Sequence, residues 1–367
     1  MSRAVWLAGV SGLLVPLVIE AQTPDSAGVP VRVSGYVTTS FTHSTHPAGR
    51  VLVGRLYERR QDEFMLNAGT LIIERAAATN HVDAGFRLEA LFGQNAAVVK
   101  SVGLDLGANA DIWQAFAVLN LPFGASGRYM QFKAGKMATL MGVEVGEEVL
   151  NPNLGVGSQD IFLEPFTETG AELGAKLGPA LDAQVRISNG WDQVTDVNTG
   201  KTIMARLGFA PVAGALVAMV AYVGPEQAGT NGPKRAGVDL VLSAKPAAAT
   251  TAWVQLDYGQ EDSLRTGGGR AKWYGAGLWL TQELSRRAML ALRTDYVDDR
   301  DGARTSGALG FPAHTGQKLA SATATVNFRY APQVLLRPEI RYDRSTLRAY
   351  AGHRDQLSAG LGLSYEF

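Results

Sequence analysis

The sequence predicts an all-β fold: a transmembrane, antiparallel, up-and-down β-barrel of about sixteen strands, with roughly fourteen to eighteen as the range that strand counting leaves open. Three observations predict it. Short segments alternate apolar and polar residues along most of the chain. The connections between these segments alternate between long and short. The last segment ends on an aromatic residue at the C-terminus itself, Phe367.

The alternating segments have the period of two residues that is expected of strands with one apolar and one polar face. Alternation is clearest in residues 82–92, 181–187 and 334–342. Backbone polar groups cannot remain unpaired in lipid, so strands with a lipid-facing side must close into a barrel. Candidate strands begin near Val31, Phe64, Val82, Asp111, Arg128, Glu168, Leu181, Thr202, Ala215, Ala236, Thr251, Ala271, Arg287, Lys318, Gln333 and Gln356.

The connections between candidate strands are sorted by length. Long gaps follow the odd-numbered strands, at residues 43–60, 94–110, 138–167, 190–201, 225–234, 260–269, 298–317 and 345–355. Short turns follow the even-numbered strands, at residues 79–81, 121–127, 178–180, 211–214, 246–249, 282–285 and 331–332. Outer-membrane barrels have short periplasmic turns and long external loops. The pattern therefore places both ends of the strand array on the periplasmic side.

The C-terminal segment has the features of a closing strand. Its apolar face contains Leu361, Leu363, Tyr365 and Phe367, and its other face carries Ser, Gly and Glu. One apolar and one small or polar face, ending in Tyr-x-Phe, fits the last strand of a bacterial outer-membrane barrel. An ordinary edge strand of a soluble protein is the alternative.

Composition and the first residues agree with an exported membrane protein. The chain has no Cys, and its 34 basic and 34 acidic residues give no net charge, which offers no basis for thiol chemistry or nucleic-acid binding. Residues 1–21 resemble a signal peptide, with a retained anchor helix as the alternative. Residues 22–30 are predicted to be a short periplasmic lead and residues 31–367 the barrel. The predicted location is the bacterial outer membrane.

About sixteen strands leave an interior too wide for side chains alone, and hence an aqueous channel. We expect the longest loop, residues 138–167, to fold inward and narrow this channel. Its acids would then face basic side chains of the wall and form a constriction that sets selectivity. The alternative is that these charges only solvate loops and walls. The candidate pore-lining residues are Arg87, Glu144, Glu147, Glu148, Arg287, Arg293, Arg329, Arg337 and Arg341.

Aromatic residues fall mostly near predicted strand ends. Belts of Trp and Tyr at the two membrane interfaces are expected for such barrels. The belt residues would include Tyr36, Trp113, Tyr129, Trp191, Trp253, Trp273, Trp279, Tyr296, Tyr330 and Tyr365. Trp253 lies on the polar face of its strand, so a luminal position is the alternative for it.

Two blocks of sequence resemble a known family. One comprises residues 33–41 and 64–76; the other comprises residues 133–145 and continues through 151–153 to 164–170. Together they resemble the β-barrel porin-2 family of OmpL-like outer-membrane porins. The resemblance implies a porin and says little about its solute. It also implies structural importance for Lys136, Gly142 and Glu144, with no catalytic role.

The predicted function is passive diffusion of small hydrophilic solutes through a water-filled lumen of mixed charge. A non-conducting barrel used for surface attachment or assembly is the alternative. No catalytic residue, cofactor or metal site is predicted. The expected partners are outer-membrane lipid, the barrel-assembly machinery and small hydrophilic solutes, and a homotrimer is left open.

Overall fold

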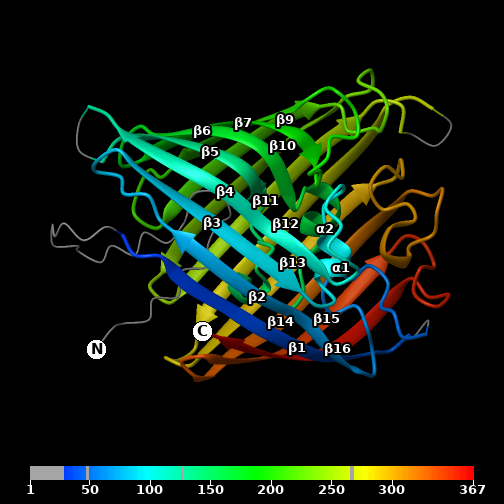
Figure 1. Cartoon of the computed structure of the whole chain (residues 1–367). Helices are drawn as coiled ribbons and strands as arrows, with labels where there is room; N and C mark the ends of the chain where they lie inside the picture. The colour runs from blue at the N-terminus through cyan, green and yellow to red at the C-terminus, as the bar shows by residue number, and fades with distance from the viewer. Residues whose placement is uncertain (1–28, 47–48, 125–126, 265–267) are drawn as a thin grey trace.

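The computed structural model describes residues 29–46, 49–124, 127–264 and 268–367. They form one closed antiparallel barrel of sixteen strands, in which each strand pairs with its neighbours in sequence and β16 pairs with β1 (Figure 1). This confirms the predicted fold and strand count. The predicted signal peptide and most of the predicted lead lie outside the described residues.

The strands begin within one residue of their predicted starts, because period-two alternation and turn residues bracket each of them. Their bounds are β1 Arg32–Ser44, β2 Phe64–Arg75, β3 Asp83–Phe92, β4 Ala110–Pro122, β5 Tyr129–Ala138, β6 Thr167–Lys176, β7 Leu181–Trp191 and β8 Thr202–Phe209. The second half contains β9 Ala215–Gly224, β10 Arg235–Ala247, β11 Thr250–Glu261, β12 Ala271–Glu283, β13 Ala288–Asp299, β14 Gln317–Ala331, β15 Val334–Ser345 and β16 Asp355–Glu366.

Long and short connections lie at opposite ends of the barrel. The long loops gather at one end, which we call the loop end, and the short turns lie with the C-terminus at the other, the turn end (Figure 1). The long loops contain short helices that the sequence patterns did not predict: α1 Ala96–Val99, η1 Glu148–Leu150, α2 Ser158–Leu163 and η2 Ala308–Gly310. Within the described residues, no helix has the length and apolar character needed to cross a membrane.

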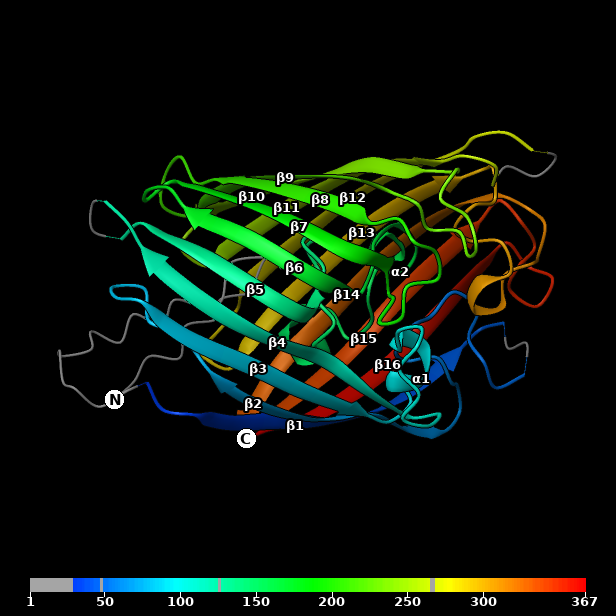
Figure 2. The ribbon, with the colours of Figure 1, turned by 45° about the horizontal axis from the view of Figure 1, so that its top comes forward.

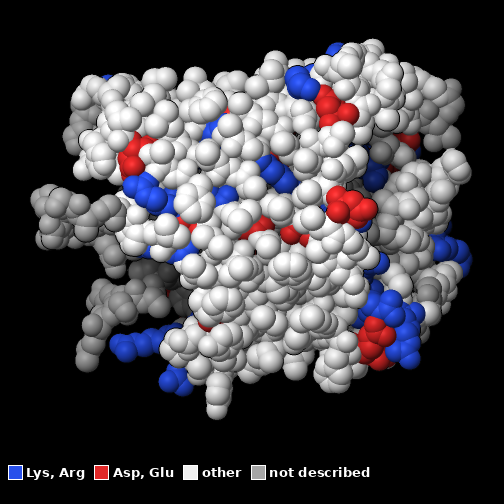
Figure 3. All heavy atoms as spheres, in the orientation of Figure 1, with Lys and Arg blue, Asp and Glu red and all other residues white. Residues whose placement is uncertain are grey.

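The two faces of the wall differ in character. Along β8, buried and exposed residues alternate strictly, with Ile203 and Leu207 outward and Met204 and Arg206 inward. Charged atoms are sparse on the part of the outer surface over β1 and β2 in Figure 3. Because an apolar outer surface of this extent is unfavourable in water, it indicates contact with lipid.

The C-terminal strand closes the barrel as predicted. Leu361, Leu363, Tyr365 and Phe367 lie on the outer face, each about half exposed. The backbone N–H of Phe367 donates to the Gly35 carbonyl at 3.0 Å, and the Gly35 N–H donates to the Phe367 carbonyl at 3.1 Å. A Cβ built on Gly35 would lie 2.7 Å from the Phe367 ring, so the ring covers this glycine. Phe367 therefore continues the pairing of β16 with β1.

Deleting Phe367 is expected to lower the fraction of chains that fold into a closed barrel. The deletion removes two β1–β16 hydrogen bonds, a loss of about 2 kcal/mol, together with the ring contact on Gly35. The folded fraction can be measured after refolding into detergent from the compact migration of unboiled protein on SDS gels. Phe367→Tyr keeps the bonds and the ring and should fold like the parent. A deletion variant that folds as well as the parent would contradict this role.

The predicted aromatic belt is wrong for several residues. Tyr36, Trp113, Trp191, Trp253, Trp273 and Trp279 are at most 6% exposed. Trp253 and Trp279 lie opposite each other on β11 and β12 and pack with Val143 of the loop between β5 and β6. Their positions in the strands put them on the inner face, and the loop covers them. Tyr330 and Tyr365, by contrast, are exposed.

Candidate functional site

The connection between β5 and β6, residues 139–166, lies inside the barrel, and we call it the inward loop. Figure 2 shows α2 and its flanking segments within the ring of strands. Residues 151–165 are all buried. The loop is folded on itself by Asn151, whose side chain bonds both the N–H and the carbonyl of Val145, at 2.8 and 2.6 Å. Apolar side chains of the loop, such as Phe162 and Leu163, pack into the interior.

One part of the inward loop is attached to β3 and β4. Arg87 of β3 forms an ion pair with Glu147, with Nη2 and Oε1 3.1 Å apart. Gln114 of β4 donates to the same oxygen at 3.1 Å. Arg87 also pairs with Glu74 and Glu89, at 2.8 and 2.7 Å. Glu147 therefore lies in a local network of mixed charge on this wall.

The loop is also attached to β13, on another part of the wall. Arg293 of β13 forms an ion pair with Glu144, with Nη1 and Oε1 2.6 Å apart and both side chains fully buried. The other oxygen of Glu144 accepts the N–H of Gly157 at 2.6 Å. A buried pair of this kind requires further hydrogen bonds to offset the cost of removing two charges from water. Gly157 and the hydroxyl of Thr323, 3.1 Å from Arg293, provide them.

Two arginines of β15 bind the backbone of the inward loop. Arg337 donates to the carbonyl of Glu148 at 2.9 Å and also to the carbonyls of Asn151 and Asn153. Arg341 donates to the carbonyl of Val156 at 2.7 Å. Attached to β3 and β4 on one side and to β13 and β15 on the other, the loop crosses the lumen.

In the structure, the acids of the inward loop and the arginines of the wall are not two separate groups that face each other across the lumen. Glu144 and Glu147 each touch an arginine directly, so their charges are balanced locally. Arg337 and Arg341 are directed at loop carbonyls, and Arg341 pairs with Asp343 of its own strand at 2.8 Å. The alternation of residues could not predict these contacts, because it indicates which face of a strand a side chain lies on and not which residue the side chain binds.

Glu148 has a different environment. It accepts a hydrogen bond from Asn95 at 2.7 Å and is 2% exposed. Burial raises the pKa of Glu148 to about 7, although the Asn95 bond and the charge of Arg337 act in the opposite direction. Its charge therefore changes near neutral pH.

Arg287 and Arg329 lie apart from the other candidate arginines. They line a cavity of about 510 Å³ at the turn end, which also touches Val149 to Pro152 of the inward loop. Arg329 forms an ion pair with Glu366 at 3.1 Å. The candidate residues thus form two groups: one where the loop crosses the lumen, and one in this vestibule between the loop and the short turns.

A second segment, in the loop between β1 and β2, also enters the interior, and the sequence reasoning missed it. Arg55 forms ion pairs with Glu58 at 2.7 Å and with Asp343 of β15 at 2.8 Å, and all three side chains are buried. Leu52, Leu56 and Tyr57 are also buried there. Three large apolar residues in an external loop were the signal that could have indicated an inward position.

The residues that the family resemblance singled out hold the loop and its neighbours in place. Lys136 pairs with Asp111 across β4 and β5, with Nζ and Oδ2 2.7 Å apart. Gly142 has a φ of +87°, and a Cβ there would clash with the carboxylate of Glu164. A residue without a side chain is therefore needed at this position.

Comparison with known proteins identifies a matching family and solved structures with a similar fold. A family model described as "Putative beta-barrel porin-2, OmpL-like" matches residues 30–367. No curated protein matches the sequence. Similar solved structures include an anion-selective porin from Comamonas acidovorans, with 11% identity, a TM-score of 0.64, and coverage of 92% of this chain and 99% of that chain.

Two further barrels are similar. OmpT of Vibrio cholerae, in a trimer form, has 9% identity and a TM-score of 0.62, covering 93% of this chain and 100% of that one. The outer membrane channel DcaP of Acinetobacter baumannii has 12% identity and a TM-score of 0.60, covering 94% and 99%. At these identities the likeness concerns the fold.

Proposed function

The chain belongs to the OmpL-like β-barrel porin-2 family, and on that premise we propose that it passes small hydrophilic solutes by passive diffusion through a lumen that the inward loop narrows. The protein is an outer-membrane channel whose strands cross the bilayer. The main support for the proposal is that residues 144–157 cross the lumen and are attached to the barrel wall on both sides. A narrow point of this kind controls the size and charge of what passes.

Selectivity is proposed to arise in two places. At the crossing, the loop and the wall share a network of mixed charge that is largely buried. It contains Arg87, Glu144, Glu147, Glu148, Arg293, Arg337 and Arg341. In the vestibule, Arg287 and Arg329 lie beside Glu283, Arg286 and Glu366. The wall bears both signs, so the proposed channel favours neither anions nor cations strongly, and the local balance at the crossing decides the remaining preference.

Single-channel recordings of two variants test the role of the crossing. Glu147→Ala removes a negative charge beside the lumen and should shift the reversal potential toward anions. Arg341→Ala should shift it toward cations. Asp105→Asn, a change of an exposed acid in another external loop, is the control and should leave selectivity unchanged. Unchanged selectivity in both luminal variants would reject the constriction.

Liposome swelling tests conduction itself. Vesicles that contain the protein should swell in neutral sugars at rates that fall with solute size, because the narrowest point sieves by size. Swelling that does not depend on solute size, or no swelling, would reject the channel and favour a barrel for attachment or assembly.

The remaining partners are also proposals. Outer-membrane lipid is supported by the apolar outer face, and the barrel-assembly machinery by the aromatic closing strand. Assembly into a homotrimer is supported by the trimer form of OmpT from Vibrio cholerae, a barrel similar to this one. Passage of solutes requires no catalysis, and the proposed function includes none.

A further inference from the structure

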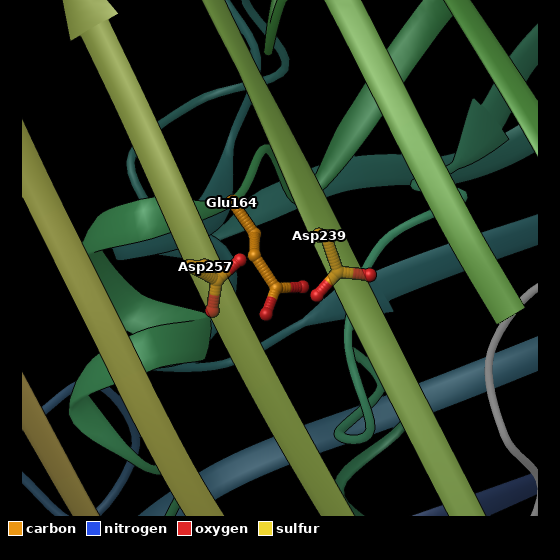
Figure 4. A group of neighbouring side chains, drawn as sticks. All are labelled: Glu164, Asp239 and Asp257. Atoms are coloured by element: carbon orange, nitrogen blue, oxygen red, sulfur yellow. The ribbon is translucent and has the colours of Figure 1, made fainter. Parts of the chain in front are cut away.

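Three carboxylates from distant parts of the chain meet inside the barrel. Glu164 follows α2 in the inward loop, Asp239 lies on β10 and Asp257 on β11, and Figure 4 shows the three groups pointing toward one another. Each offers one oxygen, and these oxygens all lie within 4.8 Å of one another. The residues are 3%, 1% and 7% exposed.

Only one of the two oxygens of each carboxylate accepts a hydrogen bond from the protein. The bonds are Gln255 Nε2 to Glu164 Oε1 at 2.6 Å, the Gly142 N–H to Asp239 Oδ1 at 3.4 Å, and Gln159 Nε2 to Asp257 Oδ2 at 2.5 Å. The other three oxygens, Glu164 Oε2, Asp239 Oδ2 and Asp257 Oδ1, are buried and have no hydrogen-bond partner among the described residues.

A glutamine that bonds to the cluster also has an unpaired oxygen. The amide of Gln159 reaches Asp257, the side chain is fully buried, and its Oε1 has no hydrogen-bond partner among the described residues. Among these residues, no ion pair joins Glu164, Asp239 or Asp257 to a lysine or arginine. Buried polar atoms are normally paired, so three carboxylates that meet in the interior, each with an unpaired oxygen, indicate a missing electropositive partner.

The geometry suits a hard divalent cation. Ca²⁺ binds carboxylate and amide oxygens at about 2.4 Å, so two oxygens on the same ion are at most about 4.8 Å apart. The three carboxylates meet this condition. Without a cation, burial and the neighbouring carboxylates raise the pKa of Glu164, so protonation is the competing way to neutralise the cluster.

We propose that a divalent cation of the calcium class binds between Glu164, Asp239 and Asp257. The ion joins the end of α2 to β10 and β11 and strengthens the attachment of the inward loop to this part of the wall, which hydrogen bonds already link to the loop. Gly142 makes the approach possible, because a side chain at this position would occupy the space of the Glu164 carboxylate. The proposal does not depend on which solute the barrel passes.

Calcium titration of the full-length barrel in detergent micelles tests the site. The protein is treated with a chelator, desalted and titrated with CaCl₂ by calorimetry, and its thermal midpoint is measured with and without the ion. The parent should bind one Ca²⁺ per barrel and unfold at a higher temperature with it. Asp239→Asn and Asp257→Asn should weaken binding by at least about tenfold, since each removes a charged ligand.

Control variants show whether calcium binds at this site or at other carboxylates of the protein. Asp105→Asn changes an exposed acid of another loop and should bind calcium like the parent. Folding of each variant is checked by compact migration on unboiled gels. If the strand variants do not fold, Glu164→Gln tests the same site from the loop.

Two results would overturn the proposal. The first is a calcium-induced shift of equal size in the parent and in every site variant, which would indicate surface or detergent binding. The second is the absence of calcium binding by the parent while Asp239→Asn stabilises the metal-free barrel, which would indicate a cluster that holds protons only. Neither result bears on conduction, which liposome swelling measures separately.

Discussion

Replacing residues 146–155 with a short Gly-Ser linker is expected to raise single-channel conductance by roughly threefold, because a sixteen-stranded barrel without an inward segment leaves a wide aqueous channel. The segment contains Glu147 and Glu148 and the backbone carbonyls that Arg337 binds. Its removal leaves the barrel wall intact, because none of its residues belongs to a strand.

The structure makes this replacement practicable. The carboxylate of Glu144 accepts the N–H of Gly157 at 2.6 Å, so the chain returns close to its starting point. A short linker can therefore bridge the gap while keeping the Glu144–Arg293 ion pair. In this variant Arg87 and Arg337 lose their partners in the loop, but water can accept their hydrogen bonds instead. We therefore expect a folded barrel.

Planar-bilayer recordings measure the conductance, and liposome swelling should show a higher size limit for neutral sugars. Removal of residues 228–232 from the exposed loop between β9 and β10 is the matched control and should leave conductance unchanged. An unchanged conductance after the 146–155 replacement would show that the inward loop does not limit passage.

Arg293→Gln is expected to destabilise the barrel by about 3–5 kcal/mol, the usual cost of removing one partner from a buried ion pair. Arg293 and Glu144 are 2% and 1% exposed, so the remaining Glu144 carboxylate would lie in the interior without its cation. The variant should also shift ion selectivity toward cations, because it removes a positive charge at the crossing.

The double variant Glu144→Gln with Arg293→Gln separates charge from packing. It should regain most of the lost stability, since no unpaired charge remains. Denaturant unfolding in detergent measures the difference. Arg270→Gln breaks an exposed ion pair of similar length, 2.7 Å to Asp262, and should cost at most about 1 kcal/mol. Equal effects of Arg293→Gln and Arg270→Gln would contradict a structural role for the buried pair.

The strand array was predictable because it follows from local patterns. Period-two alternation identifies a strand, and Gly, Pro and Asn mark its ends, so strand starts such as Phe64, Leu181 and Ala271 agree with the structure. The parity of connection lengths predicted which loops share an end. The position of the tryptophans was not predictable in the same way, because an aromatic near a strand end suits either a membrane interface or a packed lumen.

The partners of the charged residues depend on the path of the inward loop. Arg337 and Arg341 were expected among the luminal charges, but only the tertiary structure shows that they bind loop carbonyls. It also reveals Arg55 as a partner of Asp343 from a loop far away in sequence. The meeting of Glu164, Asp239 and Asp257 likewise has no sequence signature, because these residues lack the close spacing of a metal-binding motif.

The alternation of residues in this chain was thus sufficient to predict a membrane barrel, its strand count and the closing role of the strand that ends at Phe367. These properties depend on contacts between adjacent strands and on the difference between lipid and water. The crossing of the lumen, the buried Glu144–Arg293 pair and the three-carboxylate cluster depend on how a long loop folds back into a closed wall. That path is set by packing among residues far apart in sequence, which no local pattern records.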